Sequence, residues 1–325
     1  MPLSAVRRPA RRPAARRRPP AGLTLVELLV AATLGLLVLS AAGALFVGQL
    51  RAFARTHGAV AAQRDLRLGL ALLPMDLRGA SRRDGDLLAL GTDAVELRAT
   101  VAVSAVCATP TVGKTELVLP PTGLSQAALT AFFSTPRPGD VVKVLIRRAQ
   151  GGVGDDWLTA AVGADSLGPA TAAAGGLCTG APTLPLRLHV TWPAGTAAYP
   201  ADTLALVVPG MPVRVLRRVR YALYQAPSGR WYLGFSERLG DGTWSAREPI
   251  AGPYAGAGPA GGVRFAYFDT LGAALPAPVA DPRRVGRIDL TLRARTLVRA
   301  GSGTAADSVV ARDSALVRVA LRNRL

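Results

Sequence analysis

The sequence predicts an α+β protein in which one long amino-terminal helix packs against antiparallel β-sheet. Three observations carry this prediction: an uncharged apolar run near the amino terminus, leucines at helical spacing directly after it, and period-two alternation of apolar residues from Leu87 onward. The chain has 325 residues, half of them apolar. This length is sufficient for a membrane segment and one or two folded units.

The chain begins with a basic leader that precedes the apolar run. Residues 1–22 contain seven arginines and no acid, and residues 19–50 contain a single charge, Glu27. The stretch from Leu28 to Gln49 would span about 33 Å as a helix, enough to cross a bilayer core. Because the arginines precede this run, the positive-inside rule places the amino terminus in the cytoplasm and the rest of the chain beyond the inner membrane, in the periplasm.

The junction between leader and apolar run reads Gly22-Leu23-Thr24-Leu25-Val26-Glu27. A secretory signal peptide is cut after its apolar core, whereas a cut at this junction would leave the apolar segment on the mature protein. The junction resembles the class III signal of type IV prepilins, in which a basic leader ends in glycine and the fifth mature residue is glutamate. The resemblance implies that prepilin peptidase cuts between Gly22 and Leu23 and methylates the new amine on Leu23, where the family usually has phenylalanine.

The residue types at this junction suit those roles. Glycine presents no side chain to a protease cleft. A carboxylate near the end of a membrane helix costs roughly 2.5–3.5 kcal/mol, so Glu27 is expected to have a partner or a function. The freed amine of Leu23 in a neighbouring subunit is a suitable counter-charge, and this pairing would set the axial register of a filament. The alternative is that lipid headgroups solvate Glu27 at the membrane surface.

The helix is predicted to continue from its membrane part, residues 23–50, through an amphipathic part, residues 51–79. Its apolar residues form two stripes on roughly opposite faces: Leu66, Leu70, Leu73 and Leu77, and then Leu68, Leu72 and Met75. One stripe is enough for a helix packed on a single domain. Two stripes suit a helix that contacts its own globular domain and neighbouring helices, and a helix buried within one domain is the alternative. Pro74 would bend the last turn, and the helix is expected to end near Gly79.

The remainder is predicted to be antiparallel sheet, with a first β-rich region of irregular loops at residues 80–180 and a β domain at residues 181–325. The predicted strands are 95–103, 115–119, 141–147, 184–192, 204–208, 213–225, 230–237, 262–268, 287–295 and 315–322. Pro227-Ser228-Gly229 is typical of a hairpin turn. Residues 149–183 and 251–262 are rich in Gly, Ala and Pro, which predicts loops.

Three carboxy-terminal segments are similar to the end of PilW-type minor pilins and, more loosely, to that of the J-type minor pseudopilin of type II secretion: Gly262–Asp269 followed by Gly272, Val285–Leu290, and Val317–Asn323. The resemblance implies a type IV pilin-like fold and a minor pilin, stored in the inner membrane, that helps to initiate pilus assembly. The implied partners are prepilin peptidase, other minor pilins and the major pilin, with a place in a cell-surface pilus after assembly. A type II secretion pseudopilin is the first alternative.

Residues that could carry enzyme chemistry are few. The two histidines and two cysteines lack the spacing of a zinc site, and no nucleophile-elbow or phosphate-loop motif is present. We therefore expect no enzyme, cofactor or metal, and a signal-anchored enzyme is the weakest alternative. His57 and His189 are expected to be structural. Asp84-Gly85-Asp86 and Asp241-Gly242 lack an EF-hand pattern and are expected to form solvated turns.

The two cysteines, Cys107 and Cys178, would both lie outside the cytoplasm, where oxidation is permitted. A disulfide between them is expected, although spacing alone leaves two separate thiols open.

The net charge of +18 falls to +11 when the seven leader arginines are removed, and Lys114 and Lys143 are the only lysines. A basic surface can meet nucleic acid or anionic membrane, but an arginine-rich composition accounts for the same charge. DNA capture, as by a competence-type pilin, is therefore an alternative that the sequence does not favour. Arginines clustered on one exposed face and interleaved with Trp or Tyr would favour it.

Overall fold

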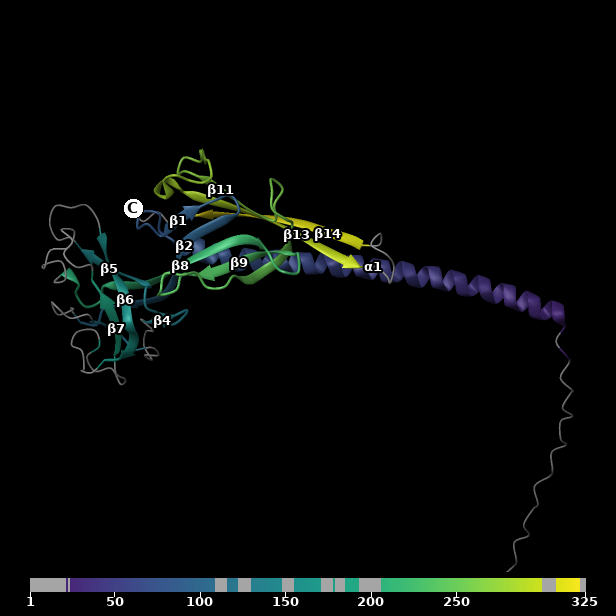
Figure 1. Ribbon diagram of the computed structural model, residues 1–325, viewed down its shortest axis with the longest axis horizontal. Coiled ribbons are helices and arrows are strands. Elements are labelled where there is room, and N and C mark those ends of the chain that lie inside the picture. The colour runs from purple at the N-terminus through teal and green to yellow at the C-terminus, as the bar shows by residue number, and fades with distance from the viewer. Residues whose placement is uncertain are drawn as a thin grey trace, which may run out of the picture. The chain divides into compact units, whose positions relative to one another are not determined.

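The computed structural model describes residues 22, 24–108, 116–121, 130–147, 155–170, 178, 185–192, 206–299 and 308–321. Within these residues it contains one long helix, α1 (Leu25–Gly79), and a sheet of 14 strands (Figure 1). The chain divides into two compact units, Met1–Phe53 and Ala54–Leu325. The helix and the sheet confirm the predicted α+β class.

The described strand pairs are all antiparallel. Along the sheet the strands follow the order β12-β11-β13-β10-β9-β8-β5-β6-β7-β3, while β14 pairs with β13, and β2 pairs with β8, β1 and β4. The bounds are β1 Leu87–Leu90, β2 Ala94–Ala105, β3 Glu116–Leu119, β4 Ala131–Phe132, β5 Val141–Arg147, β6 Asp155–Pro169, β7 Leu186–Thr191, β8 Pro212–Gln225, β9 Trp231–Glu237, β10 Glu248–Tyr254, β11 Val263–Phe268, β12 Ala274–Leu275, β13 Arg287–Arg299 and β14 Ser308–Ala320.

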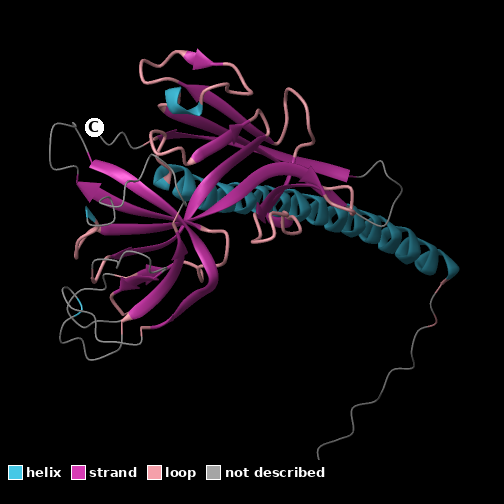
Figure 2. Ribbon diagram, turned by 60° about the vertical axis from the view of Figure 1, so that its left-hand side comes forward, coloured by secondary structure: helices cyan, strands magenta, loops and turns pink. Residues whose placement is uncertain are grey.

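The carboxy-terminal part of α1 lies along the sheet, as Figure 2 shows. One of the two predicted leucine stripes carries this contact, because Leu66, Leu73 and Leu77 are buried in the core that α1 forms with the sheet and Leu70 packs against that core half-buried. A Cβ atom added at Gly69 would lie 2.5 Å from the hydroxyl oxygen of Tyr254, so this close approach of helix and strand requires glycine. The helix ends at Gly79, as predicted.

A second core lies among β3, β5, β6, β7 and the first half of β8. The two cores share strands β2 and β8. Leu97 and Val219 belong to the core against α1, whereas Val101 and Val215 belong to the second core. The register of β2 against β8 shifts between Thr100 and Ala102, where the strand passes from one core to the other. The predicted division near residue 180 stays a prediction.

Several predicted strands and loops need correction. Residues 155–169, predicted as loop, form the long strand β6, on which Leu158, Ala160 and Val162 alternate toward the second core. Part of the other predicted loop, 251–262, belongs to β10, which pairs with β9 through an irregular register. Residues 206–208, the described part of a predicted strand, form no strand, since Pro209 and a turn at Gly210 (φ +88°) follow them.

The carboxy-terminal hairpin is longer than predicted. Strand β14 begins at Ser308 rather than near residue 315, and it pairs with β13 from Ser308 to Ala320. The predicted turn at Pro227-Ser228-Gly229 is confirmed, because the backbone N–H of Ala226 donates to the carbonyl of Arg230 at 2.9 Å and Gly229 adopts a φ of +75°.

Candidate functional site: the amino-terminal segment and the exposed faces

The amino terminus of α1 is a capping box formed by Thr24 and Glu27. The Thr24 hydroxyl oxygen accepts a hydrogen bond from the backbone N–H of Glu27 at 3.3 Å, and the Glu27 carboxylate accepts one from the backbone N–H of Thr24 at 3.4 Å. This Thr-x-x-Glu pattern directly before an apolar run is a recognised helix start, and the sequence reasoning above missed it. Glu27 is solvent-exposed, and so is Gly22. Leu23 lies outside the described residues.

The apolar part of α1 follows Glu27 directly. It contains a stretch long and apolar enough to cross a membrane, and none of that stretch is buried against the rest of the described chain. Its exposed large side chains include Leu28, Leu34, Leu39, Leu45 and Phe46. Twenty or more exposed apolar residues in one helix need an apolar environment, so this segment is consistent with membrane anchoring.

The second predicted stripe stays uncovered on the part of α1 that packs on the sheet. Leu68, Leu72 and Met75 are 42%, 47% and 64% exposed. Leu66, Leu73 and Leu77 on the other side of the same turns are buried. The helix therefore buries one apolar face in its own unit and presents a second one outward.

The comparisons with known proteins bear on this amino-terminal segment. Residues 17–43 match the family model of the prokaryotic N-terminal methylation motif. This match covers the predicted junction, Gly22, Leu23 and Glu27, and the first part of the apolar run. No curated protein and no solved structure matches the chain. The motif supports a protein of the type IV pilin or pseudopilin class. Proteins of this class are processed by prepilin peptidase and assemble with other pilins. They are structural subunits rather than enzymes.

Of the two turns expected to be solvated, the one at Asp84-Gly85-Asp86 needs correction, because Asp86 lies in the interior. Asp86 is fully buried, and its carboxylate binds the Nζ atom of Lys143 at 2.6 Å. The Oδ1 atom of Asp241 accepts from the backbone N–H and the hydroxyl of Thr243, which lowers the pKa of the Asp241 carboxyl. Among the described residues, no group of three or more His, Cys, Asp or Glu side chains is placed to hold a metal ion. His57 lies on α1 and His189 on β7.

The two cysteines lie together beside the second core. Cys107 and Cys178 are joined by a disulfide, and their Cα atoms are 5.3 Å apart. Both are buried. This separation lies within the range that a disulfide requires and supports the expected pairing.

Arginines gather on the face of the sheet that points away from α1. The register places them at alternate positions, opposite to buried residues such as Leu290 and Leu292: Arg218 and Arg220 of β8, Arg264 of β11, Arg287, Arg293 and Arg295 of β13, and Arg312 and Arg318 of β14. No signal in the sequence groups these arginines, because they come from four strands and only the strand order and register show which of them lie together.

One group on this face surrounds an aromatic ring. The guanidinium carbons of Arg218, Arg220 and Arg238 lie 5.7, 4.3 and 5.6 Å from the ring centre of Trp244. The carboxylate of Glu96, which is nearly buried, forms ion pairs with both Arg218 and Arg220. Glu96 therefore supplies one counter-charge to this group of three arginines.

Proposed function

We propose that this protein is a minor type IV pilin, a membrane-stored structural subunit that takes part in initiating pilus assembly. The observation that carries the proposal is the methylation motif at residues 17–43, which leads directly into a continuous helix of 55 residues. The first part of that helix is apolar and exposed, and the last part adds an exposed stripe of Leu68, Leu72 and Met75 behind the buried one. Both features suit a subunit whose helix packs beside the helices of neighbours.

In this proposal the amino terminus lies in the cytoplasm and the sheet in the periplasm before assembly. Prepilin peptidase cuts between Gly22 and Leu23 and methylates the amine of Leu23. The partners are other minor pilins and the major pilin. A bulky residue at position 22, as in Gly22→Trp, should block processing, and mass spectrometry of the mature protein should find Leu23 first. A mature chain that begins after residue 40 would exclude the prepilin interpretation.

Glu27 has two candidate roles that the capping box makes separable. Its carboxylate caps its own helix through Thr24, and the same carboxylate is the proposed counter-charge for the methylated amine of Leu23 in a neighbouring subunit. Glutamine can replace glutamate in a capping box but carries no charge. Glu27→Gln therefore removes the charge and keeps the cap, whereas Glu27→Ala removes both.

The test compares these two variants in cells that carry no other copy of the protein. Both should be processed and inserted, because the leader is unchanged and the helix becomes more apolar. Both should accumulate in the membrane while filament number and co-purification of partner pilins fall. Glu248→Ala, which removes an exposed glutamate from the sheet, is the matched control and should assemble normally. Normal filaments with Glu27→Ala would refute the assembly role, and normal filaments with Glu27→Gln alone would assign Glu27 to capping.

A type II secretion pseudopilin is the second candidate, since the motif is shared by both classes. A minor pilin and a pseudopilin differ in the assembly that they join, a type IV pilus or a type II secretion system. Deletion of the gene should abolish pili and leave protein secretion intact under the leading proposal. Loss of secretion with intact pili would favour the pseudopilin.

A further inference from the structure

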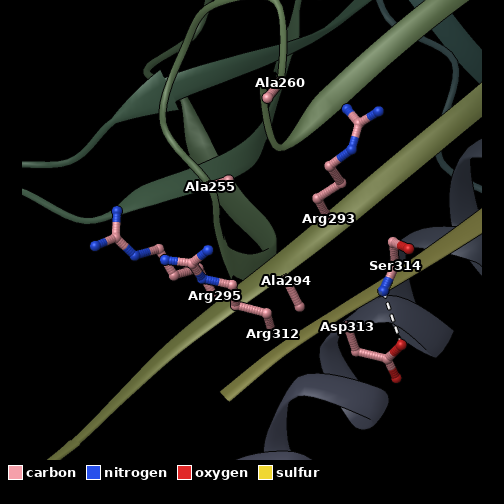
Figure 3. A pocket seen from close by; sticks show the side chains of 8 residues that line it. All are labelled: Ala255, Ala260, Arg293, Ala294, Arg295, Arg312, Asp313 and Ser314. Carbon is pink, nitrogen blue, oxygen red and sulfur yellow. Dashed lines mark hydrogen bonds between the residues drawn. The ribbon is translucent and has the colours of Figure 1, made fainter. Parts of the chain in front are cut away.

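A cleft on the arginine-rich face lies between the loop around Ala255–Ala260 and the hairpin of β13 and β14 (Figure 3). Its volume is about 540 Å³, and three arginines line it: Arg293, Arg295 and Arg312. In Figure 3 the guanidinium group of Arg293 points toward Ala260, and those of Arg295 and Arg312 lie at the other end of the cleft. A cleft of this size lined by three cations is suited to an anionic ligand.

The charges in this cleft lack counter-charges within the described part of the chain. Arg295 and Arg312 are direct cross-strand partners, and like charges in that position destabilise a strand pair. The guanidinium group of Arg293 donates a hydrogen bond to the carbonyl of Gly261 at 2.9 Å. The acid in the lining, Asp313, accepts from the backbone N–H of Ser314 and points away from Arg295 and Arg312 in Figure 3. The group around Trp244 differs, since the Glu96 carboxylate forms ion pairs with two of its arginines.

A second, smaller cleft adjoins the first. It has a volume of about 240 Å³, it shares Arg295 with the first cleft, and it adds Arg230 and Trp231. A single small anion can contact one or two of these arginines, but not four in two adjoining clefts. A strand with a repeating negative charge can contact them in series, and the half-buried ring of Trp231 offers a stacking surface for a base.

We propose that these two clefts bind the phosphodiester backbone of a single nucleic acid strand, with Arg295 and Arg312 as the principal phosphate contacts. A planar membrane surface cannot enter a cleft beneath a loop, whereas an extended strand can. This inference does not rest on the pilin assignment, since it concerns residues of the sheet alone.

The test measures binding of a fluorescein-labelled 12-nucleotide DNA strand to the protein without its leader (residues 23–325) in uncharged detergent. The seven leader arginines are removed because they would bind DNA themselves. Binding is followed by fluorescence anisotropy at several salt concentrations. Arg295→Gln/Arg312→Gln removes two phosphate contacts. The slope of log affinity against log salt should therefore fall by about 1.4, and the affinity at 0.1 M salt should fall about 25-fold. Arg295→Lys/Arg312→Lys keeps both charges and should keep the salt slope. The matched control is Arg283→Gln/Arg284→Gln, which removes two exposed charges outside the clefts and should bind within about twofold of the parent.

Thermal unfolding without DNA distinguishes a binding site from a structural one. Because Arg295 and Arg312 repel each other, their replacement by glutamine should leave the melting temperature unchanged or raise it while DNA binding is lost. The proposal would be overturned if Arg295→Gln/Arg312→Gln bound DNA as well as the parent does, or if the Arg283/Arg284 control lost as much DNA binding. It would also be overturned if inorganic phosphate saturated the clefts and did not displace the DNA strand. A double variant that no longer binds anionic-lipid vesicles but still binds DNA would overturn it as well.

Discussion

The ion pair between Lys143 and Asp86 predicts a large loss of stability when one partner is removed. The Nζ atom of Lys143 donates to the Asp86 carboxylate and to the carbonyl of Asp84, both at 2.6 Å, and the two side chains are 3% and 0% exposed. Burial lowers the pKa of Lys143, while the charge of Asp86 partly offsets this effect. Lys143→Met keeps the length of the side chain and leaves the Asp86 carboxylate buried without its closest cation.

Removing one partner of a buried ion pair costs about 3–5 kcal/mol. Arg214, whose Nη1 lies 3.5 Å from Asp86, and the backbone N–H of Ser81, at 2.9 Å, remain as partners, so we expect about 3 kcal/mol, the lower end of that range. For a chain of 325 residues, that loss lowers the melting temperature by about 4–5 °C.

The assay is thermal unfolding of the full chain, followed by circular dichroism. Lys143→Met/Asp86→Asn removes both charges and should lose less than the sum of the single variants. Arg187→Met, which breaks the half-exposed pair with Glu116, is the control and should cost less than about 1 kcal/mol. The reasoning would be refuted if Lys143→Met lowered the melting temperature by less than about 2 °C. It would also be refuted if the double variant lost more stability than the two single variants together.

Two further predictions concern the disulfide and a carboxyl group on α1. Reduction of Cys107–Cys178, which are 71 residues apart, should destabilise the fold by about 4 kcal/mol on the chain-entropy model, and alkylation of both thiols in the folded, unreduced protein would contradict the pairing. Burial raises the pKa of Asp76, and a hydrogen bond from the Tyr221 hydroxyl partly offsets it. The raised pKa means that the unfolded chain ionises at a lower pH than the folded chain. The wild type should therefore lose stability relative to Asp76→Asn as pH rises from 3.8 toward neutrality. A difference in melting temperature that stays constant over this range would exclude the effect.

The helix and most strands could be predicted because their side-chain periods are local. Leu66, Leu73 and Leu77 repeat at helical spacing and are buried, and the helix ends at Gly79 as expected. The sequence reasoning missed β6 because alanines at positions 160 and 161 and Gly163 have low β-propensity. That strand forms through pairing with β5 and β7, which a local pattern does not report.

The candidate site was predictable in one part and not in the other. Gly22, Glu27 and the apolar run stand together in the sequence, so a motif identifies them. Arg295 and Arg312 are separated along the chain and meet only through the register of β13 and β14. A one-residue slip of that register would change which side chains meet across the pair. Gly69 likewise has a packing role that appears only when Tyr254 lies against it.

The passage of β2 and β8 through both cores has a mechanical consequence. Each strand crosses from one core to the other without a linker, so the second core cannot swing about a hinge relative to the helix end at Gly79. The Nη2 atom of Arg214 on β8 also binds the carbonyl of Gly79 at 2.7 Å, which fixes the strand to the last turn of the helix. A tensile force on α1 would therefore reach the second core through strands that are hydrogen-bonded to one another and bear the load together, so the second core would move in step with the helix.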